Sequence, residues 1–342
     1  MKQNRRSHAM DGLKLLFMLL IVVHHSGYYF DVLHLAGTSV DLFFMISGYF
    51  LYHALQKKPN LGAGTYLLDR YRKLYPHYFL SFVVMFLSTS VYRVGTITLD
   101  MLLRALPEIL LVQNLGFFWG GVNYPCWHLC VLIYAGTLVF FLGRKLPKKC
   151  FHALGLFCAI VAYVYILCFP LDGKIEPFRT VGVFYLPFWR GMAGLFCGAL
   201  IYELHGSLQP VFRKYAAVFR VLEIASLIGS IALMFSSGLV DILIVICFFV
   251  LLLCVGSESS VLERLFHHPA VAASIRYEYP VFLNHAFVTG ILRKLFVDRF
   301  GFPAPVNLAV LLIVLVVYSV ITETIVRKGM AWFSEKRKKA AA

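Results

Sequence analysis

Long apolar stretches alternate with shorter polar connections along most of the chain. A helix needs about 20 mostly apolar residues to cross about 30 Å of hydrocarbon. Ten stretches meet this requirement, and their approximate ranges are 10–30, 37–55, 74–92, 127–142, 150–169, 181–203, 217–235, 239–256, 279–297 and 303–326. Residues 99–115 are also apolar, but Arg104, Pro107 and Glu108 interrupt them. The pattern predicts an all-α integral membrane protein, a bundle of about ten transmembrane helices, with an interfacial helix or re-entrant loop at 99–115.

The positive charges are distributed unevenly between the two sides that this topology creates. With the N-terminus inside and one crossing per stretch, 23 of the 32 lysines and arginines fall inside, 7 fall outside, and Lys14 and Arg190 lie within spans. An excess of basic residues marks cytoplasmic segments. We therefore expect both termini to be cytoplasmic and the protein to be a multi-pass component of the plasma (inner) membrane. The same distribution explains the net charge of +15 without a nucleic-acid partner. The basic tail from about residue 327 is expected to contact membrane lipid headgroups.

Composition agrees with a lipid-embedded chain. Hydrophobic residues make up 60% and charged residues 14%, whereas a soluble domain is about 25% charged. The eight cysteines lie mostly inside apolar stretches and form no CxxC pair, which predicts neither a disulfide framework nor a metal site. The first apolar run contains Lys14 and His25 and lacks a small-residue cleavage site, so we expect a retained span rather than a signal peptide. We expect one transmembrane domain over residues 1–342, without an attached soluble domain.

Two ionisable residues of the first span are candidates for chemistry, because a charged group inside a bilayer costs about 2.5–3.5 kcal/mol. Lys14 and His25 are eleven residues apart in the sequence. On a helix this is about 16.5 Å, with both side chains on nearly the same face. Asp41 lies near the outer end of the second span, where its carboxylate could hydrogen-bond the imidazole of His25 and raise its basicity. The alternatives are that Lys14 only extends to the cytoplasmic interface and that Asp41 caps its own helix.

The loop before the third span ends in three cations, Arg70, Arg72 and Lys73. Cations immediately before a span can simply anchor it in the headgroup region. Together with Lys14 they could instead form a cationic site for a phosphorylated ligand at the inner face. The residues alone leave both interpretations open.

Several segments, in order along the chain, resemble motifs of the membrane acyltransferase family 3. The first is Lys14 followed after ten residues by His25, and the second is 40–49 (VDLFFMISGY), which is similar to the family's VDLFFVISGF. Residues 70–76 (RYRKLYP) resemble its R-x-x-R-I-x-P signature, with lysine at the second arginine position. These three matches are specific singly, whereas the later ones support the resemblance only together with them.

The later matches extend the resemblance to the ninth span, with one departure. Arg179 followed by 186–192 (LPFWRGM) resembles the sixth-helix pattern, and 279–285 (YPVFLNH) is similar to the family's S-Y-x-I-Y-L-x-H segment. Many members show W-S-L-S-x-E in the fourth span, where this chain has 127–132 (WHLCVL). The acidic residue is absent, which indicates a divergent branch.

The resemblance implies transfer of an acyl group, commonly acetyl, from cytoplasmic acyl-CoA to a hydroxyl of an extracytoplasmic carbohydrate or lipid-linked glycan. The imidazole of His25 would remove the acceptor proton or be acylated itself, with Asp41 as its partner. Acyl-CoA, with acetyl-CoA as the expected form, is then the donor substrate, and no metal is expected. The phosphates of the donor are expected at Lys14, Arg70, Arg72 and Lys73. The acceptor is expected at Trp127, Arg179, Arg190 and His285.

Two other functions remain open at this point. One is a transporter or exporter of a small molecule or amino acid, although the sequence shows neither inverted repeats nor an attached enzyme domain. The other is a non-catalytic membrane partner of a glycan-synthesis complex. The retained Lys14, His25, Asp41 and Arg70 argue against it, although the missing acidic residue of the fourth span keeps it open. His285 also has a plain alternative, a hydrogen-bonded structural histidine. The sequence does not indicate an oligomeric state.

Overall fold

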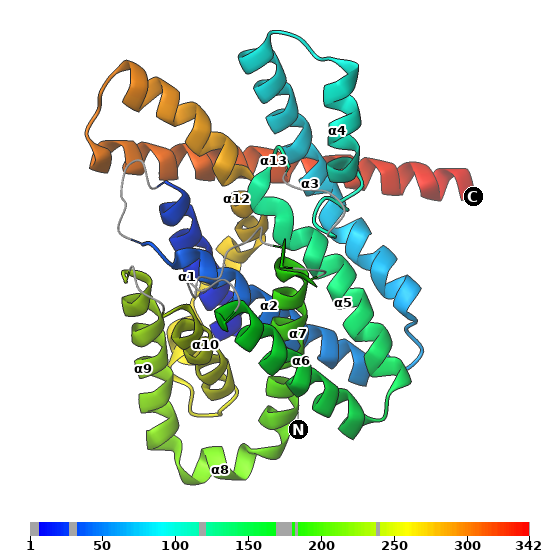
Figure 1. Cartoon of the computed structure of the whole chain (residues 1–342), viewed down its shortest axis with the longest axis vertical. Helices are drawn as coiled ribbons and strands as arrows, with labels where there is room; N and C mark the ends of the chain where they lie inside the picture. Colours follow the sequence, from blue (N-terminus) through cyan, green and yellow to red (C-terminus); the bar gives the residue numbers. More distant parts are fainter. Residues whose placement is uncertain are drawn as a thin grey trace.

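The computed structural model describes residues 7–26, 33–115, 121–168, 180–181, 184–236 and 240–341. Within these residues the chain forms thirteen α-helices (Figure 1). Their bounds are α1 His8–His25, α2 Ser39–Lys57, α3 Ala63–Val94, α4 Leu99–Ile109, α5 Trp127–Lys145, α6 Lys148–Cys168, α7 Leu186–Ser207, α8 Gln209–Lys214, α9 Ala216–Met234, α10 Asp241–Val255, α11 Val261–Leu265, α12 Pro269–Leu292 and α13 Ala304–Ala341. Short 3-10 turns lie at Ala36–Thr38 and Tyr124–Cys126, and a π-helical segment covers Arg293–Arg299. The strands β1 Thr180–Val181 and β2 Phe184–Tyr185 pair antiparallel.

The fold class predicted from the sequence, an all-α membrane protein, is confirmed. Each of the ten apolar stretches overlaps one of these helices. Five helical segments of the described chain are long and apolar enough to cross a bilayer: His8–His25, Tyr124–Lys145, Lys148–Tyr165, Ala216–Met234 and Pro305–Lys336. The apolar helix α10 has 15 residues, and α2, α3, α7 and α12 are of spanning length but more polar. The total of ten spans and the orientation of the termini therefore stay predictions.

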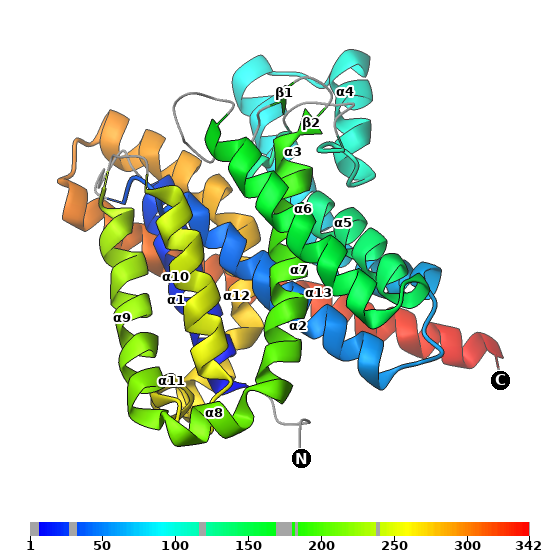
Figure 2. The ribbon, with the colours of Figure 1, turned by 60° about the horizontal axis from the view of Figure 1, so that its bottom comes forward.

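Helices α2 and α7 pack with their backbones almost in contact (Figures 1 and 2). A Cβ atom added at Gly48 of α2 would collide with the carbonyl of Leu195, and one at Gly198 of α7 would collide with the carbonyl of Met45. Small residues allow this close approach, which membrane helices use because packing and not water exclusion drives their association. The first turns of the two helices are thereby placed against each other.

Helix α1 is held firmly at its N-terminal end. The carboxylate of Glu263, on the short helix α11, accepts hydrogen bonds from the backbone N–H of His8 at 3.0 Å and of Ala9 at 2.9 Å. These N–H groups have no partner within their own helix, and a carboxylate also complements the positive end of the helix dipole. Beside this cap, the ring of Phe266 fills the space above Gly12, where no Cβ would fit. Figure 2 shows α1 inside the bundle, where it contacts both α10 and α12.

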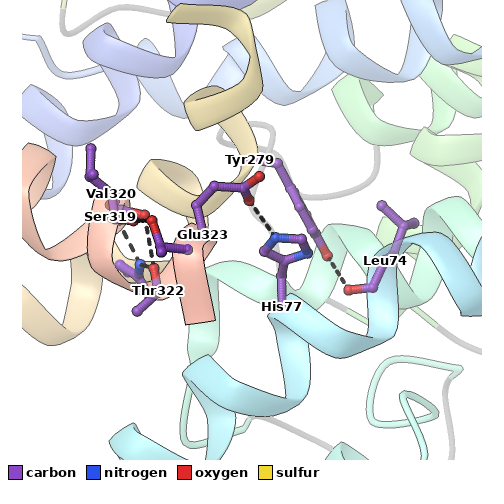
Figure 3. A network of polar contacts seen from close by, with 9 residues as sticks. Leu74, His77, Tyr279, Ser319, Val320, Thr322 and Glu323 are labelled. Atoms are coloured by element: carbon purple, nitrogen blue, oxygen red, sulfur yellow. Dashed lines mark hydrogen bonds and ion pairs between the residues drawn. The ribbon is translucent and has the colours of Figure 1, made fainter. Parts of the chain in front are cut away.

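A polar network joins α12 to α3 and α13 (Figure 3). The amide of Asn284 donates to Thr322 at 2.9 Å. His77 of α3 pairs with Glu323 of α13 at 2.6 Å, and the hydroxyl of Tyr279 donates to the carbonyl of Leu74 at 3.1 Å. Polar contacts between buried helices fix their relative rotation. The network therefore sets the face that α12 turns towards α1.

Helix α4 occupies the segment for which an interfacial helix or re-entrant loop is predicted. It has 11 residues, too few to cross the hydrocarbon core. Leu99, Leu103 and Leu106 are exposed on one face, whereas Ala105 and Glu108 are buried on the other. The leucine face is suited to lipid and the buried face packs on α3.

Candidate active site

Two histidines from distant parts of the sequence meet at the end of α1. Nδ1 of His25 lies 2.8 Å from Nε2 of His285, which is on α12 and fully buried. The two rings are stacked with centroids 4.9 Å apart and planes inclined by 18°. The ring of Tyr124 packs edge-on against His25 at 5.4 Å. His25 is thus fixed on two sides.

The hydrogen bonds of this pair decide which nitrogen carries each proton. Nδ1 of His285 contacts the backbone carbonyl of Phe282, which can only accept, so this nitrogen must donate. In the neutral ring Nε2 of His285 is then an acceptor and takes the Nδ1–H of His25. Within the described residues, Nε2 of His25 then has a lone pair without a hydrogen-bond donor. The chain of contacts therefore presents His25 as a base towards the adjacent cavity.

Asp41 does not contact His25 as predicted from the sequence, and this expectation is wrong. Its carboxylate accepts from Nε of Arg190 at 3.0 Å and from Nη2 at 2.6 Å. The hydroxyl of Tyr163 donates to the same carboxylate at 3.3 Å. Both charged groups are buried, and a buried charge requires a partner of opposite sign. The close packing of α2 on α7 places the guanidinium, not the imidazole, beside Asp41.

A cavity of about 220 Å³ opens beside His25. The side chains that line it include those of His24, Trp127, Arg190 and Asp241. The guanidinium of Arg190 lies over the indole of Trp127, 5.5 Å from the ring centroid. The structure thus brings Trp127 and Arg190 to the cavity that His25 faces, together with the ring of Phe282 that packs against His285. Arg179 lies outside the described residues.

Sequence analysis missed Asp241, a buried carboxylate in the cavity wall. It is the first residue of α10 and lies within electrostatic range of Arg190. Arg190 is therefore flanked by two carboxylates, its bonded partner Asp41 and the more distant Asp241. The available signal was an acidic residue inside the predicted eighth span, which is the kind of residue that marks a functional site in membranes.

Three of the four predicted phosphate-binding cations lie near one another, and we call Lys14, Arg70 and Lys73 the cationic cluster. Lys73 lies within electrostatic range of both Arg70 and Lys14. Nζ of Lys14 pairs with Asp11 at 3.2 Å, and Glu278 of α12 lies within range of both lysines. Sequence analysis missed these two acids, although Asp11 precedes Lys14 by one helical turn.

Arg72 lies apart from the cationic cluster. It lines a second cavity, on another face of α3, and its guanidinium pairs with Asp69 at 3.9 Å. Consecutive residues of a helix point about 100° apart, so Arg72 and Lys73 cannot share one face. Of the four cations for which phosphate binding is predicted, the structure thus brings three together.

Comparison with known proteins decides the family. A family model for acyltransferase family 3, described as an acyltransferase domain, matches residues 7–324. This chain belongs to that acyltransferase family. No curated protein and no solved structure matches the chain.

In this acyltransferase the start of α5 departs from the family pattern in a definite way. Leu132, at the position of the family's acidic residue, packs partly buried against the core around α2 and α5. His128 donates from Nδ1 to the carbonyl of Pro125 at 3.1 Å, and its ring meets that of Phe282 edge-on at 4.5 Å. The carboxylate of Glu108 reaches the same region from α4 and accepts from the backbone N–H of Asn123 at 2.8 Å.

Proposed function

We propose that this acyltransferase moves an acyl group, acetyl in the expected case, from cytoplasmic acyl-CoA to a hydroxyl of an extracytoplasmic carbohydrate or lipid-linked glycan. The observation that carries the proposal is the contact of Nδ1 of His25 with His285, from which we infer that Nε2 of His25 carries the lone pair. A general base must present such a nitrogen to the proton that it removes. The family supplies the reaction class, acyl transfer.

The chemistry of the proposed step needs one base. Nε2 of His25 takes the proton of the acceptor hydroxyl as its oxygen attacks the thioester carbonyl. The carbon–sulfur bond then breaks, and the thiolate of CoA takes the proton back from the imidazolium. While the imidazolium exists, its Nδ1–H bonds Nε2 of His285, whose own N–H is held by a backbone carbonyl. His285 thus orients His25 in the role that a carboxylate holds in a Ser-His-Asp triad.

The donor is proposed to extend along α1. Its phosphates bind the cationic cluster, where Asp11 pairs with Lys14 and Glu278 lies within electrostatic range of both lysines. The rise from Lys14 to His25 is about 16.5 Å, comparable to an extended pantetheine arm of about 15–20 Å. With Lys14 towards the cytoplasm, the thioester reaches His25 near the outer face. This orientation has both termini in the cytoplasm and the protein in the inner membrane.

The acceptor is proposed to enter the cavity beside His25. The indole of Trp127 offers a flat apolar face for a sugar ring, and Asp241 offers an acceptor for hydroxyl donors. Arg190 is held by Asp41, so it keeps Trp127 in position and balances the carboxylates instead of binding an anion. Arg179 remains an acceptor-binding residue by resemblance alone.

The test is acyl transfer by the purified protein in liposomes. In the liposome assay, radiolabelled acetyl-CoA is supplied on one side of the membrane. In a second experiment, mass spectrometry compares the glycans of cells with and without the protein. The proposal expects a glycan ester that depends on His25 and is lost in His25→Ala. Transport of a labelled solute without consumption of acyl-CoA would overturn it.

A further inference from the structure

Three tyrosines on one face of α3 hold the C-terminal end of α4. Tyr71, Tyr75 and Tyr78 are spaced by four and three residues, so they lie in one row. Their hydroxyls donate to the three successive carbonyls of residues 108–110 at distances of 2.6–2.9 Å. The last carbonyls of a helix have no donor within the helix. The three tyrosine hydroxyls therefore supply hydrogen-bond donors to the carbonyls at the end of α4.

A second cavity, of about 670 Å³ and widely open to the surface, lies beside this row between α3, the end of α4 and α5. The rings of Tyr71, Tyr75 and Tyr134 form much of its wall, together with Leu110 and Val112. The hydroxyls of Tyr71 and Tyr134 also bond each other. With their hydroxyls engaged, the tyrosines offer mainly ring surface to the interior, and the cavity is suited to a hydrocarbon chain.

Arg72 is the charged residue among those that line this cavity. Its side chain is 71% exposed, and its contact with Asp69, itself 55% exposed, is 3.9 Å long. A pair of this length is not a hydrogen bond, so the guanidinium donors stay available to an anion at the rim. Leu106 of α4 and Leu110, the residue that follows α4 and lines the cavity, are both exposed. Exposed leucines beside an apolar cavity indicate that the bilayer adjoins it.

We propose that this cavity binds an anionic phospholipid of the surrounding bilayer. One acyl chain packs between the tyrosine rings, and the phosphate group pairs with the guanidinium of Arg72. The apolar interior alone would accept any hydrocarbon, so Arg72 supplies the selection for an anionic headgroup. The site is separate from the cationic cluster and from the cavity beside His25, and it does not depend on the reaction proposed above.

Native mass spectrometry of the whole protein in detergent tests this site. Phosphatidylglycerol or phosphatidylcholine is added, and the lipids retained per protein are counted. The wild type is expected to retain one phosphatidylglycerol and to prefer it over phosphatidylcholine. Arg72→Ala should bind it about fivefold more weakly. Val112→Trp should fill the cavity and abolish retention of both lipids.

A matched control comes from α4. Arg104 is also exposed and is paired with Asp100 one helical turn away, but it does not line the cavity. Arg104→Ala should retain phosphatidylglycerol as the wild type does. If Val112→Trp does not fold, the comparison of Arg72→Ala with Arg104→Ala still tests whether Arg72 binds the lipid phosphate. Equal retention by the two arginine variants would overturn the proposal, as would equal retention of the two lipids. A polyprenyl phosphate retained in place of phospholipid would overturn the phospholipid assignment and identify a carrier lipid.

Discussion

The two ends of α1 are built in opposite ways. At the His25 end, the partners His285, Asp41 and Arg190 are buried, and short, directed contacts join the polar groups, such as His25 to His285 at 2.8 Å and Arg190 to Asp41 at 2.6 Å. At the other end, the side chain of Lys14 is 24% exposed and pairs with Asp11 at 3.2 Å, while Glu278 lies only within electrostatic range of the two lysines. The same helix thus connects a rigid polar site to a partly hydrated cluster of charges.

The difference indicates two kinds of task. A reacting group must be held within a fraction of an ångström, which buried and mutually oriented side chains achieve. A cluster that captures phosphates needs net charge more than fixed geometry, and water and salt screen each of its charges. Changes at the His25 end should therefore cost much more than changes at the Lys14 end. The predictions below test this contrast in order of expected effect.

Substitution of His25 should have the largest effect. His25→Ala removes the proposed base and should lower kcat by roughly 10²–10⁴-fold. Initial rates with labelled acetyl-CoA measure this, and His152→Ala on α6, a histidine that bonds Tyr52 away from the cavity, is the control. Turnover of His25→Ala at the wild-type rate would remove His25 from the chemistry.

Asp41→Asn should destabilise the protein more than it affects proton transfer. The neutral amide leaves the buried guanidinium of Arg190 without its counter-charge, at a cost of about 3–5 kcal/mol. Thermal unfolding in detergent measures the loss, and the double variant Asp41→Leu with Arg190→Met should recover much of it because both charges are gone. A stable but inactive Asp41→Asn protein would instead support a direct role of Asp41 in the reaction.

His285→Asn should lower kcat by a smaller factor, roughly 10–100-fold. The amide can still accept a hydrogen bond, but its dipole stabilises the imidazolium of His25 less well than a neutral imidazole. KM for acyl-CoA should stay unchanged, because His285 is remote from the cationic cluster. If kcat also stays unchanged while the melting temperature falls, His285 is a structural histidine.

Lys73→Ala should raise KM for acyl-CoA about tenfold and leave kcat unchanged, because one charge-assisted contact to phosphate is lost. Added salt should reduce the difference between this variant and the wild type, since exposed charges are screened. Arg72→Ala is the matched control on the same helix and should leave KM unchanged. If Arg72→Ala raises KM as much as Lys73→Ala does, the separation of Arg72 from the cationic cluster is contradicted.

Hydrophobic pattern was enough to find the helices but not their partners. The apolar stretches located α1 and α13, because a run of about 20 apolar residues has few stable structures other than a membrane-spanning helix. The partner of His25 is 260 residues away and the partner of Asp41 is 149 residues away. Only the packing of α1 on α12 and of α2 on α7 selects these contacts. A local pattern carries no information on such pairings.

The division of the cations on α3 was beyond the sequence for a different reason. The sequence placed the three cations in a loop before the third span, whereas the structure has all of them inside α3, which begins at Ala63. The register of α3 against α1 and α5 decides that Lys73 faces Lys14 whereas Arg72 faces the tyrosine-lined cavity. That register depends on contacts such as the ring stack of Tyr66 on Phe140, with centroids 4.4 Å apart.

The cap that Glu263 forms on the first turn of α1 has a consequence for donor length. Lys14 and His25 keep a constant separation because they lie on one helix, and the cap holds the position of that helix along its axis. The helix therefore sets a fixed distance between the cationic cluster and the imidazole of His25. Insertion of a single residue between the two would lengthen it by about 1.5 Å and turn the imidazole by about 100°. A donor with an arm shorter than this distance would bind through its phosphates, but its thioester would not reach His25.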